Sequence, residues 1–139
     1  MNRWINSFTS IHIALYRLTG GFLGGKLGRQ SILLLHSTGA HTAKKHITTL
    51  SYYRDRQRYL VVASNWGKGR NPGWYYNLLA HPQTTIQVMS QTIAVQAQPA
   101  LADEYPRLWQ LVTSQNDQYR RYQYGLNRRI PIMILTPSS

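Results

Sequence analysis

Apolar residues recur at spacings of three and four near the beginning of the chain, which is the period of one helix face. The repeating positions are Trp4, Phe8, Ile11, Leu15 and Leu18. They predict an amphipathic helix over residues 2–18, within an N-terminal segment 1–18, whose other face carries arginine and polar residues. Either packing against the domain or contact with an anionic membrane surface explains such a helix. Glycines concentrated in residues 19–30 predict a Gly-rich connector after it.

From residue 31 onward the pattern changes to short β-branched, aromatic and aliphatic runs separated by polar, turn-like segments. Such runs predict strands. The expected strands are residues 32–35, 47–53, 59–63, 86–88, 93–97 and 130–135. Residues 54–57 form the expected hairpin turn between the second and third strands. The fourth and fifth alternate apolar and polar positions, as half-buried antiparallel strands do.

Two further helices are predicted between these strands. Asn71 at the N-cap and Pro72 at the first helical position favour a short helix. Asp103 and Glu104 suit the N-terminus of a longer helix that continues to about residue 122. About six strands with these helices predict a mainly β (α+β) fold, in which a small, mostly antiparallel barrel has helices packed outside.

Charge is the strongest feature of the composition. Sixteen Lys and Arg against four Asp and Glu give a formal charge of +12, so an anionic partner is expected. With only four carboxylates in the chain a catalytic dyad or a two-metal site is nearly impossible to assemble, which argues against glycosidase and metallophosphatase chemistry, and no metal is expected. Without Cys the chain has no disulfide and no thiolate zinc site.

Length and hydropathy set the organisation. The 139 residues suit one domain, residues 1–139, because separate cores need roughly 100 residues each. No apolar run approaches the roughly 20 residues that span a bilayer, and the first twenty residues do not have the pattern of a secretory signal. We therefore expect a cytoplasmic protein.

Residues 37–46, between the first two strands, combine hydroxyl groups, a glycine and four side chains that can carry positive charge. The four are His41, Lys44, Lys45 and His46. Exposed backbone N–H groups in such a loop form a cradle for an anion, and phosphate is the natural ligand. The spacing is not that of a P-loop. A solvated basic hairpin is the alternative, and charge does not choose between a nucleotide cofactor and nucleic acid.

Residues 63–77 carry a second signal. A loop interrupted by glycines leads into a helix N-terminus, which suits another anionic or carbonyl-rich group. The aromatic residues that can wall a planar ring are Trp66, Trp74, Tyr75 and Tyr76. In the alternative reading Trp74 and Leu78 belong to the core and the rest is a loop.

Four segments together resemble the deazaflavin-dependent nitroreductase and quinone reductase family. They are residues 33–39, 59–64, 71–82 and 129–132, and the similarity runs from about residue 16 to residue 137. The most specific part is Asn-Pro-Gly-Trp-Tyr-Tyr-Asn-Leu at residues 71–78, which follows a Val-Ala-Ser strand. The resemblance implies a split β-barrel that binds coenzyme F420, whose reduced form gives hydride to a quinone or nitroaromatic acceptor. The phosphate and glutamate tail of F420 suit a chain of charge +12.

The resemblance also implies which residues bind the cofactor. The phosphate region corresponds to Ala40, His41, Thr42 and His46, with Lys44 and Lys45 adding charge. The cofactor-lining strand corresponds to Ile47, Thr48, Thr49, Leu50 and Ser51. The deazaflavin cradle corresponds to Val62, Ala63, Ser64, Asn65, Gly73, Trp74, Tyr75, Tyr76 and Asn77. Tyr119 and Tyr122 resemble the cofactor-capping and substrate-facing tyrosines, and Ser64 resembles the hydrogen-bonding serine.

The chain departs from the family pattern at four positions. His41 replaces a common lysine, His46 another basic residue, Thr49 a proline and Asn116 a tyrosine. Because related split barrels use other cofactors, FMN is the alternative to F420, and haem is a further one.

Hydride transfer is the chemistry of the cofactor, so the protein has to orient the ring and stabilise charge on the acceptor. Ser64, Tyr119 and Tyr122 are the expected catalytic residues, as hydrogen-bond donors to the acceptor oxygen. One alternative function is a non-catalytic carrier of F420, flavin, a tetrapyrrole or a fatty acid on the same barrel. The other is a nucleic-acid-binding module that stacks bases on Trp66, Tyr52 and Tyr53.

With the reductase as the main interpretation, no nucleic-acid partner is expected, and the protein is a monomer or a homodimer. Any membrane binding is expected to be peripheral, with residues 1–18 in contact with the inner face of the plasma membrane.

Overall fold

The structure is a computed structural model that describes residue 13, residues 26–27 and residues 30–138. The helix expected over residues 2–18 therefore lies outside the described residues except at Ile13, and the connector over residues 19–30 except at three positions. Ile13 is helical and half-buried, and it packs against Ile32 and Leu34.

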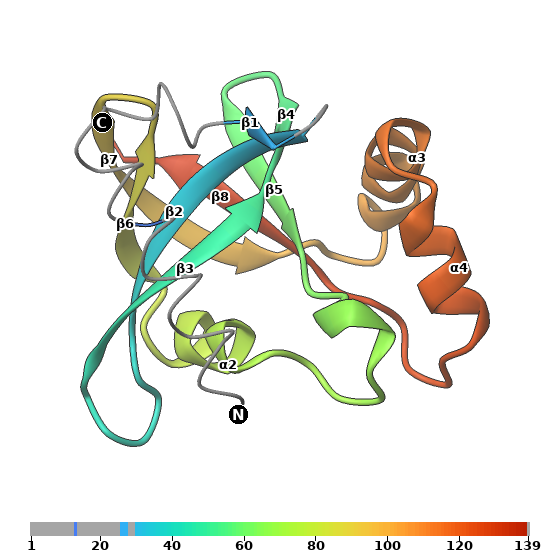
Figure 1. Cartoon of the computed structure of the whole chain (residues 1–139), viewed down its shortest axis with the longest axis horizontal. Coiled ribbons are helices and arrows are strands. Elements are labelled where there is room, and N and C mark those ends of the chain that lie inside the picture. Colours follow the sequence, from blue (N-terminus) through green and yellow to red (C-terminus); the bar gives the residue numbers. More distant parts are fainter. Residues whose placement is uncertain (1–12, 14–25, 28–29, 139) are drawn as a thin grey trace.

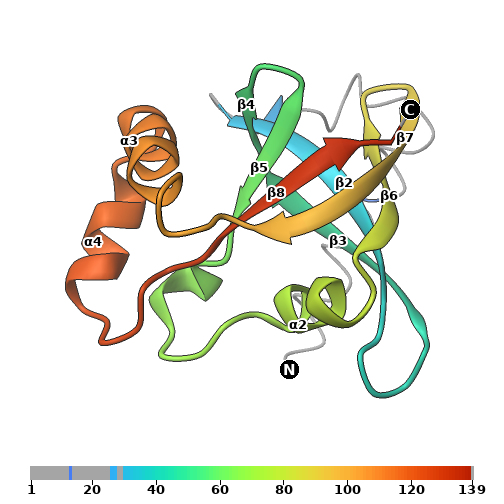
Figure 2. The same cartoon turned by 180° about the vertical axis from the view of Figure 1, so that it is seen from behind.

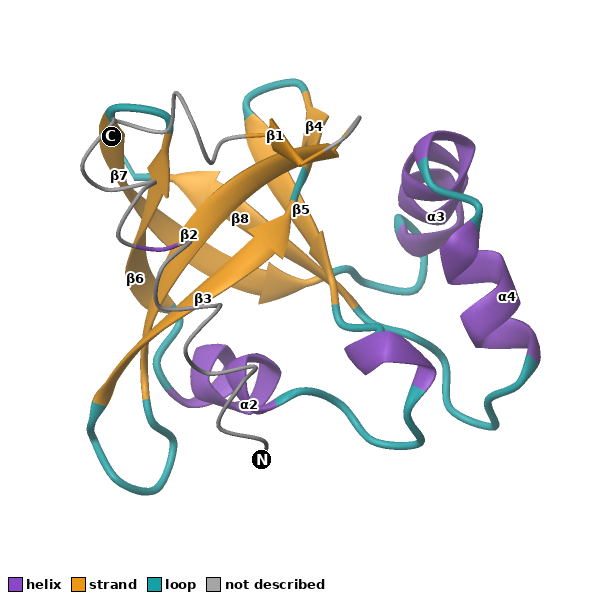
Figure 3. Ribbon diagram, viewed as in Figure 1, coloured by secondary structure: helices purple, strands orange, loops and turns teal. Residues whose placement is uncertain are grey.

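The described part of the chain folds into an antiparallel barrel with helices outside it (Figures 1 and 3). The strands are β1 (Lys26–Leu27), β2 (Gln30–Thr38), β3 (Lys45–Ser51), β4 (Tyr53–Asp55), β5 (Arg58–Val62), β6 (Gln83–Val88), β7 (Gln91–Pro99) and β8 (Ile132–Pro137). The helices are the 3-10 turn η1 (Asn65–Gly67), α2 (Gly73–Ala80), α3 (Tyr105–Gln115) and α4 (Gln118–Tyr124). The strand order is β3-β2-β6-β7-β8-β5-β4, and β1 pairs with the beginning of β2.

The barrel closes through a bend in the chain. The expected strand over residues 47–53 is two strands, because Tyr52 interrupts it and its N–H donates to Ser31 O at 3.0 Å. Before the bend β3 pairs with β2, and after it β4 pairs with β5. Among the described strands β3 has no second partner, so one of its edges is left without a ladder. The short β4 and β1 raise the number of described strands to eight, against about six expected.

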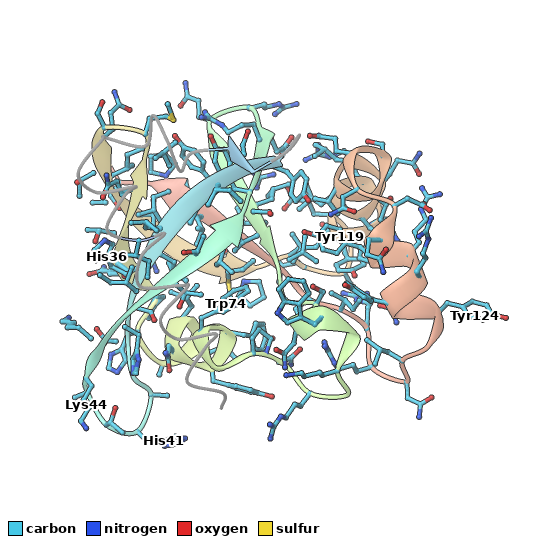
Figure 4. All side chains as sticks on the ribbon, viewed as in Figure 1. His36, His41, Lys44, Trp74, Tyr119 and Tyr124 are labelled. Atoms are coloured by element: carbon cyan, nitrogen blue, oxygen red, sulfur yellow. The ribbon has the colours of Figure 1, made fainter. Side chains whose placement is uncertain are left out.

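Alternate residues of each strand point into the barrel, and these inward positions are apolar. Leu33 and Leu35 of β2 belong to the inner core, whereas Ile32 and Leu34 point to the outer face. From α2, Trp74 and Leu78 complete the inner core at one end of the barrel. Figure 4 shows Trp74 between α2 and the strands.

A second core lies between the barrel and the last two helices, which stand together on one flank (Figure 2). The outer faces of β5 and β8 contribute Leu60, Val62, Ile132 and Ile134. The helices contribute Leu108, Val112 and Tyr119. This packing fixes α3 and α4 against the same strand, β5, whose end leads into the candidate site.

Two helix predictions are corrected. The helix expected to continue to residue 122 is broken, because Asn116 is extended (φ −147°) and its Oδ1 accepts the N–H of Gln118 at 3.1 Å. The short helix begins at Gly73 with Pro72 at the N-cap, one residue later than expected. The side chain of Asn71 accepts a hydrogen bond from Arg128 instead of capping the helix.

None of the helices that the structure describes has the length and apolar character needed to cross a bilayer. Nor do the described residues bring three or more metal-ligating side chains together.

Candidate functional site

The hairpin between β2 and β3 is tightly folded. The N–H of Gly39 donates to Lys44 O at 2.7 Å, and the N–H of Ala43 donates back to Gly39 O at 3.2 Å. A Cβ at Gly39 would lie 2.5 Å from Thr42 Oγ1 and 3.2 Å from His46 Nε2. A glycine is therefore needed here, because the hydroxyl and the imidazole close over this position.

A cavity of about 500 Å³ lies between this hairpin, β3 and the first turns of α2. Its lining residues are Gly39, Ala40, His41, Thr42, Lys44, His46, Thr48, Gly73, Trp74 and Asn77. In Figure 4 His41 and Lys44 lie at the tip of the hairpin, and Trp74 lies at the helix. The structure thus brings together residues that are more than thirty positions apart in the chain.

Asn77 joins the helix to the hairpin. Its Oδ1 accepts the N–H of Ala40 at 3.0 Å, and its Nδ2 donates to the buried Ser37 Oγ at 3.3 Å. Both ends of the amide are engaged, so the orientation of this side chain is fixed. The hairpin and α2 are consequently held as two walls of one cavity.

The electrostatic character of the cavity is positive. Its titratable lining side chains are His41, Lys44 and His46, and no carboxylate of the described residues lines it. The first turn of α2 adds backbone N–H groups and the positive end of the helix dipole. No side chain occupies the space beside Gly73, where an added Cβ would meet nothing within 4 Å. This donor set fits an anionic group such as a phosphate.

The strand β3 presents only alternate residues to this cavity. His46, Thr48 and Leu50 lie on the inner face, since Thr48 and Leu50 are paired with Leu35 and Leu33 of the inner core. The outer face carries Lys45, Ile47, Thr49 and Ser51. The Oγ1 of Thr49 is buried there without a hydrogen-bond partner in the described structure. Of the strand residues expected to line the cofactor, the cavity receives Thr48.

The loop from β5 to α2 carries the second group of expected residues. Ala63 is buried in the inner core, whereas Val62 belongs to the outer core under the helices. Ser64 and Asn65 are half-buried at the start of the loop. Asn65 and Trp66 both have left-handed backbone conformations, with φ of 50° and 59°. For residues with a Cβ this conformation is strained, and such strain concentrates at functional sites.

The expected tyrosines take different places. Tyr119 is 8% exposed, and its hydroxyl accepts a hydrogen bond from Tyr53 at 3.0 Å (Figure 4 places Tyr119 between α4 and the barrel). Burial, reinforced by that hydrogen bond, raises the pKa of Tyr119 far above its usual range. Tyr122 is half-buried against η1, where a Cβ at Gly67 would lie 2.7 Å from its ring. Neither tyrosine lines the cavity, and Tyr122 contacts the loop that carries Ser64.

The tyrosines of α2 complete the aromatic group. Tyr75 is half-buried and packs against the inner core, and its ring meets that of Tyr76 edge to face at 5.4 Å. Tyr76 is 47% exposed. Tyr75 and Tyr76 lie beside the cavity rather than in its lining.

Arg128 is a residue of this site that the sequence analysis did not identify. It lies in the segment before β8, and its guanidinium group donates hydrogen bonds to Ala63 O, Ser64 O and Asn71 Oδ1. Two adjacent arginines at 128 and 129 look alike in the sequence, so no local pattern distinguishes the one that reaches the loop.

A second cavity, of about 530 Å³, lies at the other end of the barrel near the turn between β4 and β5. There Arg58 donates to both Asp55 and Glu104, and Arg107 donates to both carboxylate oxygens of Asp55 at 2.9 Å. Arg58 and Arg107 are thus already neutralised by carboxylates. The cavity beside the hairpin has no such neutralisation.

The sequence match extends over nearly the whole chain. The family model described as F420H(2)-dependent quinone reductase matches residues 8–137. The chain belongs to this family. The resemblance that residues 71–82 carry is thereby confirmed.

Known members are similar in sequence and in fold. An F420H(2)-dependent quinone reductase of Mycobacterium tuberculosis is 40% identical over 145 aligned positions, which cover 98% of this chain and 97% of that protein. The solved F420-H2 dependent reductase FDR-A has a TM-score of 0.69 and 30% identity, over 75% of this chain and 92% of its own. Another structure, described as a domain-swapped dimer, has a TM-score of 0.72 and 28% identity, over 95% and 96%. These likenesses confirm the split β-barrel expected for a member of the F420H2-dependent quinone reductase family.

Proposed function

We propose that this protein is an oxidoreductase that transfers a hydride from reduced coenzyme F420 to a quinone, with nitroaromatic compounds as a second class of acceptor. The family assignment over residues 8–137 carries the proposal. When bound, the reduced deazaflavin supplies the hydride, and the protein supplies binding, orientation and charge stabilisation.

The positive cavity beside the hairpin is the proposed site for the acidic part of the cofactor. Lys44 provides charge, the two histidines provide imidazole N–H groups, Thr42 and Thr48 provide hydroxyl donors, and the first turn of α2 provides backbone N–H groups. The absence of a carboxylate among the described lining residues supports this assignment, because a buried carboxylate would repel a phosphate.

The planar ring is proposed to lie next to this cavity, toward the loop that begins at Ser64. Trp74 walls the cavity on that side, and Ala63 and Ser64 enter the loop directly from β5. Among the described strands β3 pairs only with β2, so the backbone groups on its other edge are proposed to bond the heteroatoms of the ring. Together these groups exclude water from one side of the ring.

Ser64 and Tyr122 are the proposed donors to the acceptor oxygen as it gains negative charge. Such a donor typically contributes about 3 kcal/mol to transition-state stabilisation. Tyr119 remains a candidate, but its side chain is buried and does not line the cavity, and its hydroxyl accepts a hydrogen bond from Tyr53. Its proposed role is to fix α4, and with it Tyr122, beside the loop.

The test uses the purified chain with F420 and with FMN in parallel titrations, followed by anaerobic mixing of the reduced-F420 complex with menadione. Binding of F420 and protein-dependent oxidation support the proposal. Binding without turnover indicates the carrier, and binding of neither cofactor to the folded protein contradicts both. The nucleic-acid alternative loses one of its three stacking residues, because Tyr53 is 6% exposed, and the family assignment favours the reductase over it.

A cytoplasmic location with peripheral membrane contact through residues 1–18 is part of this proposal. It rests on the amphipathic pattern alone, since that segment lies outside the described residues. Replacing Trp4 and Phe8 by serine should reduce co-sedimentation with vesicles containing anionic lipid. Unchanged partition would leave residues 1–18 a packing role only.

A further inference from the structure

One side chain fastens the connection between β5 and α2 at its beginning, its middle and its end. The Nη1 of Arg128 donates to Ala63 O at 3.2 Å and to Asn71 Oδ1 at 2.7 Å. Its Nη2 donates to Ser64 O at 3.0 Å. Lys68 O accepts from both Nε and Nη2, at 3.3 and 3.0 Å. All five N–H bonds of the guanidinium group are thus directed at residues 63–71.

The conformation that these bonds hold carries backbone strain at Trp66, whereas glycine and asparagine adopt left-handed angles readily. Asn65, Trp66 and Gly67 are three consecutive left-handed residues, with φ of 50°, 59° and 78°. Trp66 is 81% exposed, so its indole gives the loop little packing. Within the loop, short-range bonds such as Gly67 N–H to Ser64 O at 3.0 Å shape the turn but do not tie it to the barrel. Packing of Tyr122 against Gly67 and the hydrogen bonds of Arg128 make that connection, and of the two only Arg128 reaches both ends of the loop.

The acceptors are all neutral oxygens. Among the described residues, Arg128 forms no ion pair with a carboxylate, in contrast to Arg58 and Arg107. These contacts therefore depend on the planar, forked geometry of the guanidinium group, because a lysine ammonium cannot span acceptors on both ends of the loop. The positive charge also remains available beside Ser64.

We propose that Arg128 is a positioning residue for hydride transfer, a role that rests on the proposed function of the protein. By holding Ser64 and Asn71 at the two ends of the loop, it sets the hydroxyl of Ser64 relative to the first turn of α2. That turn lines the cavity proposed for the acidic part of the cofactor. Arg128 acts through these residues and does not itself need to touch the ring.

The first test is independent of any cofactor, because the loop contains two trypsin sites. Lys68 and Arg70 are exposed, yet Lys68 O is held by two hydrogen bonds from Arg128. In the cofactor-free protein, Arg128→Gln should raise the rate constant for cleavage after these residues by on the order of tenfold. The fragments are identified by mass. The matched control is Arg129→Gln. The guanidinium carbon of Arg129 lies 3.8 Å from the ring centroid of Tyr105, away from the loop, so this variant should leave the cleavage rate unchanged.

The second test measures turnover below the melting temperature. Arg128→Gln should raise KM for reduced F420 and lower kcat, each on the order of tenfold, and Arg128→Lys should recover only part of either. Asn71→Ala removes one bond of the five and no charge, so it should produce a smaller change in the same direction. It also keeps the inference testable if Arg128→Gln fails to fold.

The two tests separate this inference from the proposed function. A folded Arg128→Gln protein that is cleaved at the wild-type rate overturns the inference. So does a labile loop that leaves both kcat and KM unchanged. If the wild-type protein binds no F420, the proposed function fails, whereas the cleavage result still reports on the loop.

Discussion

Asn77, on the second turn of α2, accepts the backbone N–H of Ala40 at 3.0 Å and so links the helix to the tip of a hairpin 37 residues earlier in the chain. The other end of the same amide donates to Ser37. One uncharged side chain therefore sets the separation of the two walls of the positive cavity.

Replacing Asn77 by alanine should weaken F420 binding by about tenfold, because the hairpin loses its contact with α2. Asn77→Asp is informative because it keeps the acceptor for Ala40 but adds negative charge to the cavity. We expect it to bind F420 more weakly than Asn77→Ala does, although its hairpin contact is retained. Fluorescence titration measures both, with the exposed Asn127→Ala as the control. Equal affinity for F420 of the wild type, both Asn77 variants and Asn127→Ala would contradict the proposed cavity.

The two lysines of the hairpin should contribute differently. Lys44 lines the cavity, whereas Lys45 lies on the outer face of β3, where its Nζ donates to Thr38 Oγ1 at 2.9 Å. Lys44→Gln should weaken F420 binding by about threefold to tenfold at low ionic strength, and Lys45→Gln by less. Titrations at several salt concentrations compare them. A larger loss for Lys45→Gln would place the anionic group on the other face of the strand.

Two glycines in the loop after β5 offer a matched pair. Gly67 has φ of +78°, and a Cβ there would lie 2.7 Å from the ring of Tyr122, whereas a Cβ at Gly69 would meet nothing within 4 Å. Gly67→Ala should lower the free energy of unfolding by about 1–3 kcal/mol and raise KM for the quinone, because Tyr122 must move. Gly69→Ala should be nearly neutral. Thermal melts and steady-state kinetics test the pair, and similar behaviour of both variants would remove Tyr122 from the proposed acceptor site.

The ion-pair cluster at the far end of the barrel predicts how stability depends on pH. Hydrogen bonds from Arg107 and Arg58 hold the pKa of Asp55 well below its usual range, and the hydrogen bond from Arg58 lowers the pKa of Glu104. A carboxylate whose pKa is lower in the folded state stabilises the fold above its ordinary pKa of about 4, and this contribution is lost as the pH falls below that value.

Asp55→Asn should therefore cost about 2–3 kcal/mol in the free energy of unfolding at neutral pH, and the difference from wild type should shrink as the pH falls below about 4. Asp103→Asn, at an exposed carboxylate, is the control. Urea unfolding from pH 7 to pH 3 measures both. A constant difference over that range would show that the cluster does not stabilise the protein by charge.

The sequence predicts those parts of the fold in which local pattern and tertiary environment agree. Strands β6 and β7 alternate apolar and polar residues, and the pairing of Ile86 with Ile93 joins apolar positions across the two strands. The break at Tyr52 could not be predicted, because its partner is brought to it only by folding, whereas the break at Asn116 is a local turn that the helix-period pattern obscured. Tyr52 bonds to Ser31, and the extended Asn116 turns its amide toward α4.

The candidate site likewise contains residues that the sequence predicts and residues that it does not. Residues 40–42, 46–51 and 73–77 are predicted from the family resemblance and Lys44 and Lys45 from their charge, and the alternation of β3 predicts two sets of side chains but not which set faces inward. Only the pairing with Leu33 and Leu35 determines that. Arg128 could not be found from the sequence, because four of its five hydrogen bonds go to backbone oxygens, which every residue possesses.

The central claim is that this chain binds reduced F420 and passes its hydride to a quinone. Anaerobic mixing of the wild-type protein with reduced F420 and menadione, followed by the return of the oxidised deazaflavin absorbance, tests it most directly. The account predicts oxidation that saturates with F420, exceeds the protein-free rate, and falls by about a hundredfold in Ser64→Ala. Folded protein that leaves the rate at the protein-free value would contradict it.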